Sequence, residues 1–351
     1  GSNNYLASAV VRDNKAGVAY VDITTGEFAT TQIPLSRVSS EITRLAPREL
    51  ILGEPWSNEI ILDGLLTTTR VDEQQFHPTW SNDILKTHFK VKSLQPYGCE
   101  QLPLAIQSAA AIIEYVRHHQ RDALAGINSL RTYSTESFMI LDDQTRKNLE
   151  LFAGGRWDSK EASLFSILNR TSTPMGGRML KRWLGQPLLD LDELIKRQES
   201  VDWFSTDPLR RDKMTSLLKA MSDLERLSTK VLNGNATPRD LSGISKSLGV
   251  VPAITQLLGK GDDSWKIDQV LSKFSDNSGT YSLLSSSLTE QPPLYPGDGS
   301  TIKEGFSEEL DLIRNEVADA ENSMVTMESS EKVRTGIKSL KIGYNKVFGY
   351  F

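Results

Sequence analysis

The chain has 351 residues, 24% of them charged and 38% hydrophobic, and its formal net charge at pH 7 is −5. At roughly 100–200 residues per domain, this length predicts two or three globular domains. The acidic balance argues against a protein that coats nucleic acid along its whole length, because phosphate binding relies on clustered Lys and Arg.

The first third of the chain is predicted to be α/β. Two β-rich runs, Tyr5–Val11 and Val18–Ile23, flank a loop at 12–17 that is rich in turn-forming residues, and this arrangement predicts a hairpin. A third strand is predicted at Glu27–Ile33, so the chain opens with three meandering strands.

A crossover is predicted next. A helix that Pro47 ends is followed by a strand at Glu49–Leu52, and the order strand, helix, strand predicts a mixed sheet. A second helix is predicted over the apolar-rich stretch Pro103–Ala125. The first of these helices is indicated by three apolar residues at helical spacing, Val38, Ile42 and Leu45.

From about Leu149 onward the chain is predicted to be all-helical. Thr173-Pro174, Asp207-Pro208 and Thr237-Pro238 each place a capping side chain before a proline at the first helical position. Capping boxes are predicted at Asp190-x-x-Glu193 and Ser222-x-x-Glu225. Five helix starts this close together predict short, packed helices.

The last predicted helix carries one apolar stripe. Apolar residues alternate steps of four and three, the a/d spacing of a coiled coil, and no Gly or Pro occurs from Ser307 to Thr335. Such a helix is roughly 40 Å long at 1.5 Å per residue. Its form favours a lever over an ordinary packing helix, and its seam is predicted to pack on the helices after Thr173. We define the lever seam as Phe306, Leu310, Ile313, Val317, Met324 and Met327, with Ala320 completing the spacing.

Motifs for catalysis, cofactor binding and metal binding are absent from the sequence. The phosphate-binding motif G-x-x-x-x-G-K-[ST] fails at Gly259-Lys260, because Ile254 stands in place of the upstream glycine. None of the four histidines lies in an H-E-x-x-H motif. The single cysteine, Cys99, excludes an intramolecular disulfide and fits a small buried hydrophobe in a reducing cytoplasm. No apolar run approaches the ~20 residues that a membrane-spanning helix needs.

Two local clusters of cations stand out against the net negative charge. One lies between Glu161 and Asp190, and the other follows Glu331. Each cluster is interpreted as solvated helix surface in preference to a phosphate track. The first cluster is Arg170, Arg178, Lys181 and Arg182, and the second is Lys332, Arg334, Lys338, Lys341 and Lys346.

Several long stretches resemble the MutS family of DNA mismatch-repair proteins. Residues 136–151, ESFMILDDQTRKNLEL, resemble the opening of its core domain, and 163–184, SLFSILNRTSTPMGGRMLKRWL, continue the likeness. The segments DLERL at 223–227 and PRDL at 238–241 resemble the following part, and TGIKSLKIGYNKVFGY at 335–350 resembles the entry to the clamp. The resemblance covers nearly the whole chain and is weakest at 67–95 and 259–290.

The resemblance implies a multidomain chain of the α/β plus all-α class. Residues 1–130 correspond to the connector domain, which in this family has a ribonuclease H-like fold, and 131–351 correspond to a helical core and lever domain that ends at the first strand of a truncated clamp. The mismatch-binding domain, most of the clamp and the Walker motif of the ATPase are missing. Because Gly1-Ser2 also looks like a tag-cleavage scar, a non-catalytic excised fragment is expected.

The family also implies partners for the whole protein. It is expected to be a homodimer in the cytoplasm, to bind mismatched double-stranded DNA and to act as a DNA-dependent ATPase that holds ATP and Mg outside this segment. A MutL-type partner is expected to bind the connector domain. Lys341 and Lys346 are the candidate phosphate contacts in this chain.

Two alternatives remain open at this point. The three-strand meander ends at Asp22, which in an active ribonuclease H-like fold would bind a catalytic metal, so a metal-dependent nuclease is one alternative. Such chemistry needs several carboxylates, and no second strand-borne aspartate is evident, so a turn-forming role for Asp22 is favoured. The other alternative is a helical interaction scaffold outside DNA repair.

Overall fold

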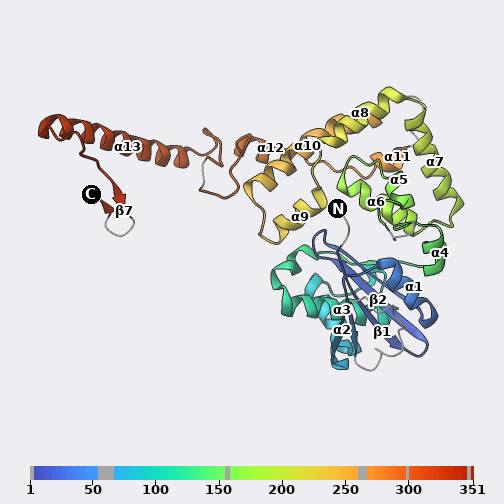
Figure 1. Cartoon of the computed structure of the whole chain (residues 1–351). Helices are drawn as coiled ribbons and strands as arrows, with labels where there is room; N and C mark the ends of the chain where they lie inside the picture. Colours follow the sequence, from blue (N-terminus) through green and yellow to red (C-terminus); the bar gives the residue numbers. More distant parts are fainter. Residues whose placement is uncertain (1–3, 54–66, 155–158, 260–266, 298–299, 346–348) are drawn as a thin grey trace.

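The computed structural model describes residues 4–53, 67–154, 159–259, 267–297, 300–345 and 349–351. An α/β domain and a helical domain lie beside each other, and one long helix projects from the helical domain (Figure 1). A short hairpin lies at the far end of that helix. Among the described residues, no helix combines the length and the apolarity needed to cross a membrane.

The α/β domain is built on a six-stranded mixed sheet in the order β5-β4-β1-β2-β3-β6. The pairs β1–β2 and β2–β3 are antiparallel, whereas β1–β4, β4–β5 and β3–β6 are parallel. The predicted meander, crossover and mixed sheet are confirmed.

The strands are β1 Tyr5–Arg12, β2 Lys15–Asp22, β3 Glu27–Pro34, β4 Glu49–Gly53, β5 Thr67–Val71 and β6 Arg131–Thr132. The helices are α1 Val38–Leu45, α2 Pro78–Phe89 and α3 Pro103–His119, with short 3-10 turns at Leu35–Arg37, Glu73–Phe76, Gln95–Tyr97 and Arg121–Gly126.

The hairpin between β1 and β2 is tighter than the sequence predicts. Only Asp13 and Asn14 form the turn, with φ of 48° and 61°. Two-residue turns with positive φ match the twist of paired strands, and Asp and Asn tolerate that conformation better than most residues. The predicted loop at 12–17 is therefore too long, because Lys15, Ala16 and Gly17 pair with β1 as strand residues.

Helix α3 lies directly on the sheet. A Cβ at Gly17 would come within 1.9 Å of the Leu104 carbonyl oxygen, so only glycine allows this approach. The Ser108 hydroxyl donates to the Ser8 carbonyl at 2.7 Å, and Thr30 Oγ1 donates to the Ala105 carbonyl at 2.8 Å. The helix is six residues shorter than predicted, because the chain turns after His119 into the 3-10 segment that buries Ala123.

The rest of the chain, where the structure describes it, is helical apart from the terminal hairpin and isolated bridges, as predicted. Its helices are α4 Asp143–Asn148, α5 Leu164–Leu168, α6 Pro174–Gly185, α7 Leu191–Ser205, α8 Pro208–Lys219, α9 Leu224–Leu232, α10 Pro238–Leu258, α11 Asp268–Leu271, α12 Ser278–Ser287 and α13 Glu308–Thr335. The hairpin consists of β7 Tyr344–Asn345 and β8 Gly349–Tyr350.

Four of the five predicted helix starts are confirmed by their caps. The side chains of Thr173, Asp190, Asp207 and Thr237 each accept a hydrogen bond from the backbone three residues on. The predicted cap at Ser222 is wrong by one residue, because Asp223 caps α9 by accepting from the Arg226 amide. An aspartate can cap and also pair with a cation, and Asp223 does both.

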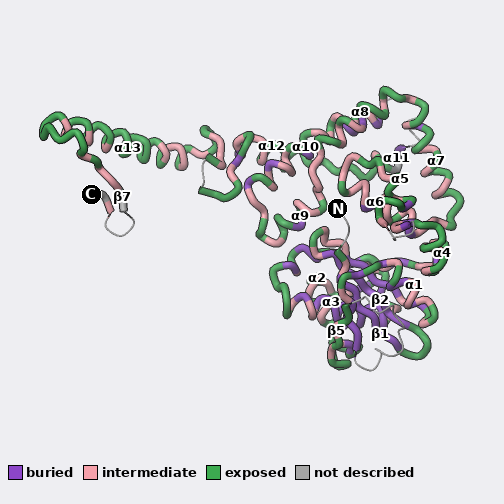
Figure 2. The backbone as a smooth tube through the Cα atoms, in the orientation of Figure 1, coloured by how far each residue is buried: buried purple, intermediate pink, exposed green. Residues whose placement is uncertain are grey.

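Burial differs sharply between the two domains. Figure 2 shows the buried residues concentrated in the α/β domain, whereas the helical domain is mostly half-buried or exposed. Trp203, Met214, Ile254, Leu258 and Ile267 form the small helical core. Cys99 is buried in the α/β core, as predicted, and burial raises the pKa of its thiol.

Candidate functional site

The two domains meet at a junction that we define as residues 133–146. Its connecting segment is pinned by the Met139 amide, which donates to the Pro187 carbonyl at 2.8 Å, and by the Leu189 amide, which donates to the Ser137 carbonyl at 3.2 Å. Arg146 Nη2 donates to the Gly185 carbonyl at 2.8 Å. The segment between the domains is therefore held by hydrogen bonds to the residues that end α6 and follow it.

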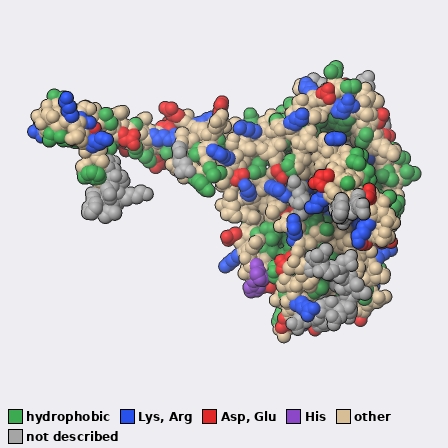
Figure 3. All heavy atoms as spheres, in the orientation of Figure 1, with side chains coloured by type: hydrophobic (Ala, Val, Ile, Leu, Met, Phe, Trp, Pro, Cys, Tyr) green, Lys and Arg blue, Asp and Glu red, His purple; other side chains and the backbone are tan. Residues whose placement is uncertain are grey.

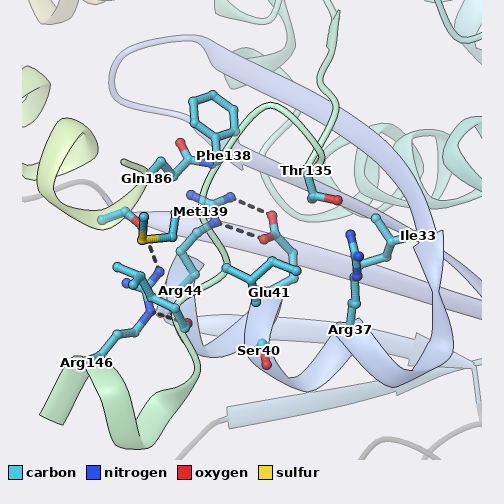
Figure 4. A pocket seen from close by; sticks show the side chains of 13 residues that line it. Ile33, Arg37, Ser40, Glu41, Arg44, Thr135, Phe138, Met139, Arg146 and Gln186 are labelled. Carbon is cyan, nitrogen blue, oxygen red and sulfur yellow. Dashed lines mark hydrogen bonds and ion pairs between the residues drawn. The ribbon is translucent and has the colours of Figure 1, made fainter. Parts of the chain in front are cut away.

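A buried ion pair lies under this junction. Arg44 Nη2 and Nε donate to the two carboxylate oxygens of Glu41 at 2.6 and 2.9 Å, and the Tyr133 hydroxyl donates to Glu41 Oε1 at 2.5 Å. Figure 4 shows Arg44 and Glu41 facing each other in the wall of a cavity of about 50 Å³, with Arg146 nearby. Tyr133 follows β6, so the pair ties α1 to the start of the junction.

Burial sets the electrostatics of this network. Burial by itself raises the pKa of Glu41, but the hydrogen bonds and charge of Arg44 outweigh it and hold the pKa below its usual value. Burial raises the pKa of Tyr20 to about 12 and that of Tyr133 well above its usual value. Both tyrosines are therefore neutral donors at neutral pH.

A second ion-pair cluster joins α6 to α9. Arg178, whose side chain is 5% exposed, donates to both carboxylate oxygens of Asp223 at 2.7 and 2.8 Å and to Glu225 at 2.5 and 3.0 Å. The Asp223 hydrogen bonds raise the pKa of Arg178, and the Arg178 hydrogen bonds lower the pKa of Asp223. The interpretation of the first cation cluster as solvated surface is therefore wrong for Arg178, because its partners come from a helix 45 residues away.

The domains also touch at Gly126 and at an exposed ion pair. A Cβ at Gly126 would lie 2.7 Å from Thr229 Cγ2 and 2.9 Å from Asn233 Oδ1, both on or next to α9. Glu27 and Arg182 form an ion pair at 3.5 Å. Helical and α/β domains are therefore in van der Waals contact where the 3-10 turn meets α9.

Changing Gly126 to Ala is expected to destabilise this contact. The added methyl overlaps Thr229 and Asn233, and overpacking of this kind costs about 1–3 kcal/mol. Urea unfolding should show the loss, and limited proteolysis should cut the junction faster. Gly279→Ala is the control, because no other part of the chain lies within 4 Å of its added methyl and alanine inside helix α12 should stabilise rather than destabilise. Equal stability of the two variants would contradict the proposed contact.

Phe306 of the lever seam lies just before α13 and the other seam residues lie on it, but α13 packs along no other helix in the described part of the chain. None of the residues of α13 is buried, and Phe306, Ile313, Val317 and Met327 are 44–60% exposed. Leu310 and Met324 are half-buried. The predicted packing on the helices after Thr173 is wrong, because α13 projects away from those helices (Figures 1 and 2).

Lys341 is exposed just beyond α13, and Lys346 lies outside the described residues. Lys332 and Arg334 are paired with Glu328 and Glu331 on α13. No ion pair is described for Lys338 or Lys341 in the part of the chain that the structure covers. Cations and acids are interspersed along the arm on the face shown in Figure 3.

Asp22 has the contacts of a turn-forming residue. It is buried, and its carboxylate accepts from the Asn4 amide at 3.0 Å, the Thr24 amide at 2.9 Å and the Thr24 hydroxyl at 2.6 Å. No group of three or more His, Cys, Asp or Glu placed to hold a metal ion occurs among the described residues. Nothing in these contacts supports the nuclease alternative.

Sequence reasoning missed both buried ion-pair clusters. The spacing of Glu41 and Arg44 on one helix was a usable signal, because residues three apart share a helix face. No sequence signal points from Arg178 to Asp223 or from Glu41 to Tyr133, since those pairs form across 45 and 92 residues.

Comparison with known proteins gives a consistent result. Residues 4–128 match the family profile MutS domain II, and residues 144–341 match MutS domain III. The chain is 35% identical over 349 residues to the DNA mismatch repair protein MutS of Dehalococcoides mccartyi strain CBDB1, covering 99% of this chain and 41% of that relative. It is 39% identical over 374 aligned positions to the same-named protein of Methanosarcina mazei, covering 100% and 41%. The chain thus spans about 41% of the length of these relatives.

Proposed function

This chain belongs to the MutS family of DNA mismatch repair proteins, and from that membership we propose that it mechanically links a DNA-holding clamp to an ATPase in the whole protein. Residues 1–130 act as the connector domain, and 131–351 act as the helical core and lever domain. This part is itself non-catalytic, and the whole protein recognises mismatched double-stranded DNA in an ATP-dependent manner.

The observation that carries this proposal is the form of α13. Its 28 residues span about 42 Å at 1.5 Å per residue. Ser307 caps the start, Gly336 ends it in the left-handed conformation, and acids in the first turn and cations in the last turn complement the helix dipole. A long helix with its ends specified and no buried residue is a rigid arm, and its far end carries the segment that resembles the entry to the clamp.

The connector assignment is supported by the sheet. The antiparallel meander β1–β2–β3 is followed by helix α1 and by strand β4, which pairs in parallel with β1. This opening is the feature on which the resemblance to a ribonuclease H-like fold rests. The turn-forming contacts of Asp22 support a connector that has no nuclease activity. We propose this domain as the binding surface for a MutL-type partner.

The remaining assignments concern the whole protein, and we propose them from membership of the MutS family. The whole protein is proposed to act in the cytoplasm as a homodimer, with ATP and Mg bound outside the residues of this chain. Lys341 and Lys346 are proposed phosphate contacts at the entry to the clamp, because no acid follows Glu331.

The lever proposal predicts the effect of charge on the seam. Replacing Ile313 and Val317 together with Asp in the whole protein is expected to place charge on the exposed apolar stripe of the arm and to uncouple ATP binding from DNA release. Both residues are more than half exposed in this chain, so the core of the helical domain should survive. Release of heteroduplex DNA after ATP addition measures the coupling, and circular dichroism measures folding.

A matched control lies on the same helix. Asn315→Asp with Ala318→Asp adds the same charge off the seam, at exposed positions, and should leave coupling intact. Normal coupling in a folded Ile313→Asp, Val317→Asp protein would refute the lever role.

A further inference from the structure

A second cavity lies between the domains. It has a volume of about 290 Å³ and is lined by Tyr5 and Tyr20 of the sheet, Arg146 of α4, Phe152, and residues at the end of α6. That size is at the lower end of small-ligand pockets, which span roughly 300–1,000 Å³. Both domains therefore contribute walls to one site large enough for a small molecule.

The lining of this cavity is strongly basic. Among the described residues that line it, the only acid is Asp143, which pairs with Lys147 at 2.6 Å. Three of the other cations have carboxylate partners: Arg44 has Glu41, Arg178 has Asp223 and Glu225, and Arg182 has Glu27. The cations that line the cavity are Arg44, Arg146, Lys147, Arg178, Lys181 and Arg182.

Two cations in the cavity have no ion pair to a carboxylate within the described part of the chain. Lys181 Nζ lies 5.4 Å from the centroid of the Phe152 ring, and Arg146 donates to the carbonyls of Leu141 and Gly185. Burial lowers the pKa of Lys181, with Lys160 adding to the effect. Burial also lowers the pKa of Arg146, and the charge of Arg44 lowers it further. The carboxylates of Glu41 and Asp143 raise it, but by less.

A half-buried cation without a counter-anion is unfavourable unless an anion pairs with it. Lys181 and Arg146 approach the cavity from different helices, and the Arg182 pair with Glu27 is long at 3.5 Å and exposed. An anion in the cavity could therefore be held by three cations at once. Guanidinium groups match the oxygens of a phosphate, and a lysine ammonium adds a point charge.

We propose that this interdomain cavity binds the phosphate groups of a small anion, with Lys181, Arg182 and Arg146 as the contacts. The volume suits pyrophosphate or the terminal phosphates of a nucleotide and excludes a duplex. Tyr5 and Tyr20 of the α/β domain line the same cavity as Lys181 and Arg182 of the helical domain, so a ligand there lies between the two domains and its binding stabilises their placement. This site is separate from the lever and does not depend on the function proposed for it.

Isothermal titration of the 351-residue chain with inorganic pyrophosphate tests the proposal. Lys181→Gln and Arg182→Gln are each expected to weaken binding about tenfold, because a hydrogen bond to a charged group contributes roughly that factor. Affinity should fall as salt rises. The matched control is Lys213→Gln on α8, an exposed lysine outside the cavity, which should leave binding unchanged. Thermal melting of each variant confirms folding.

Three outcomes would overturn the proposal. One is no binding of pyrophosphate by the unchanged chain in the millimolar range. Another is equal affinity of the unchanged chain and the folded Lys181→Gln and Arg182→Gln variants, or an equal loss in Lys213→Gln. The third is that a DNA duplex binds more tightly than pyrophosphate and that Lys181→Gln weakens the binding of both. That result would assign the cations to a nucleic-acid backbone. ADP in a parallel titration distinguishes a nucleotide from free pyrophosphate as the source of the phosphate.

Discussion

Glu41→Gln is expected to lower the free energy of unfolding by about 3–5 kcal/mol, the cost of breaking a buried ion pair by removing one partner. The substitution leaves the Arg44 guanidinium buried without its carboxylate, and the introduced side-chain amide would point a donor at another donor. Tyr133 also loses its charged acceptor. Urea unfolding followed by circular dichroism measures the loss, and hydrogen exchange should localise it to the α/β domain.

The Glu114–Arg117 pair provides the matched control. It has the same i,i+3 spacing, but its side chains are 21% and 36% exposed. Glu114→Gln should therefore cost less than about 1 kcal/mol, as exposed pairs do. Similar losses in the two variants would show that burial is not the source of the effect.

The same pair predicts a pH dependence. The folded-state pKa of Glu41 lies below its usual value, so its contribution is fully present above the unfolded pKa of about 4.3. The contribution is lost as pH falls through the lower folded pKa. The stability difference between the unchanged chain and Glu41→Gln should therefore be constant near neutral pH and shrink in acid.

Asp223→Ala is expected to cost about 3 kcal/mol, because it removes two roles of one side chain. Loss of the bidentate contact to Arg178 accounts for about 2 kcal/mol, the usual contribution of a hydrogen bond to a charged group, and loss of the α9 cap accounts for about 1 kcal/mol. Unfolding in urea, followed through the signals of the helical domain, is the measurement.

Asp223→Asn separates the two roles. Asparagine keeps the cap but carries no charge, so this variant should lose only the stability that comes from the contact with Arg178. Because the folded pKa of Asp223 is lowered, that part is present above the unfolded pKa of about 3.9 and disappears as pH falls through the folded value. An Asp223→Asn protein as unstable as Asp223→Ala would show that the cap contributes nothing.

Local signals in the chain predicted most of the elements. The caps at Thr173, Asp190, Asp207 and Thr237 are read directly from residues whose side chains reach a backbone amide three positions on. Such contacts need no distant partner. The uninterrupted stretch from Ser307 to Thr335 likewise specified α13 almost to the residue.

The misplaced cap at Ser222 shows where local reasoning fails. Ser222 and Asp223 are both good capping residues, and the one that caps α9 is also the one that contacts Arg178 on another helix, a partner that local sequence does not reveal. The predicted packing of the lever seam is wrong for a related reason. Its spacing specifies an apolar stripe, but which surface covers that stripe depends on the direction in which the helix leaves the domain.

The sequence by itself determined the α/β and helical classes, the long arm and the family, because hydrophobic periodicity, capping residues and extended motifs are local properties of the chain. Only the tertiary structure decided that Arg178 is buried, that Glu41, Arg44 and Tyr133 form one network, and that Arg146 and Lys181 face a single cavity. Those groups are brought together by packing across tens of residues, and their charges acquire their energetic weight only when burial removes them from water.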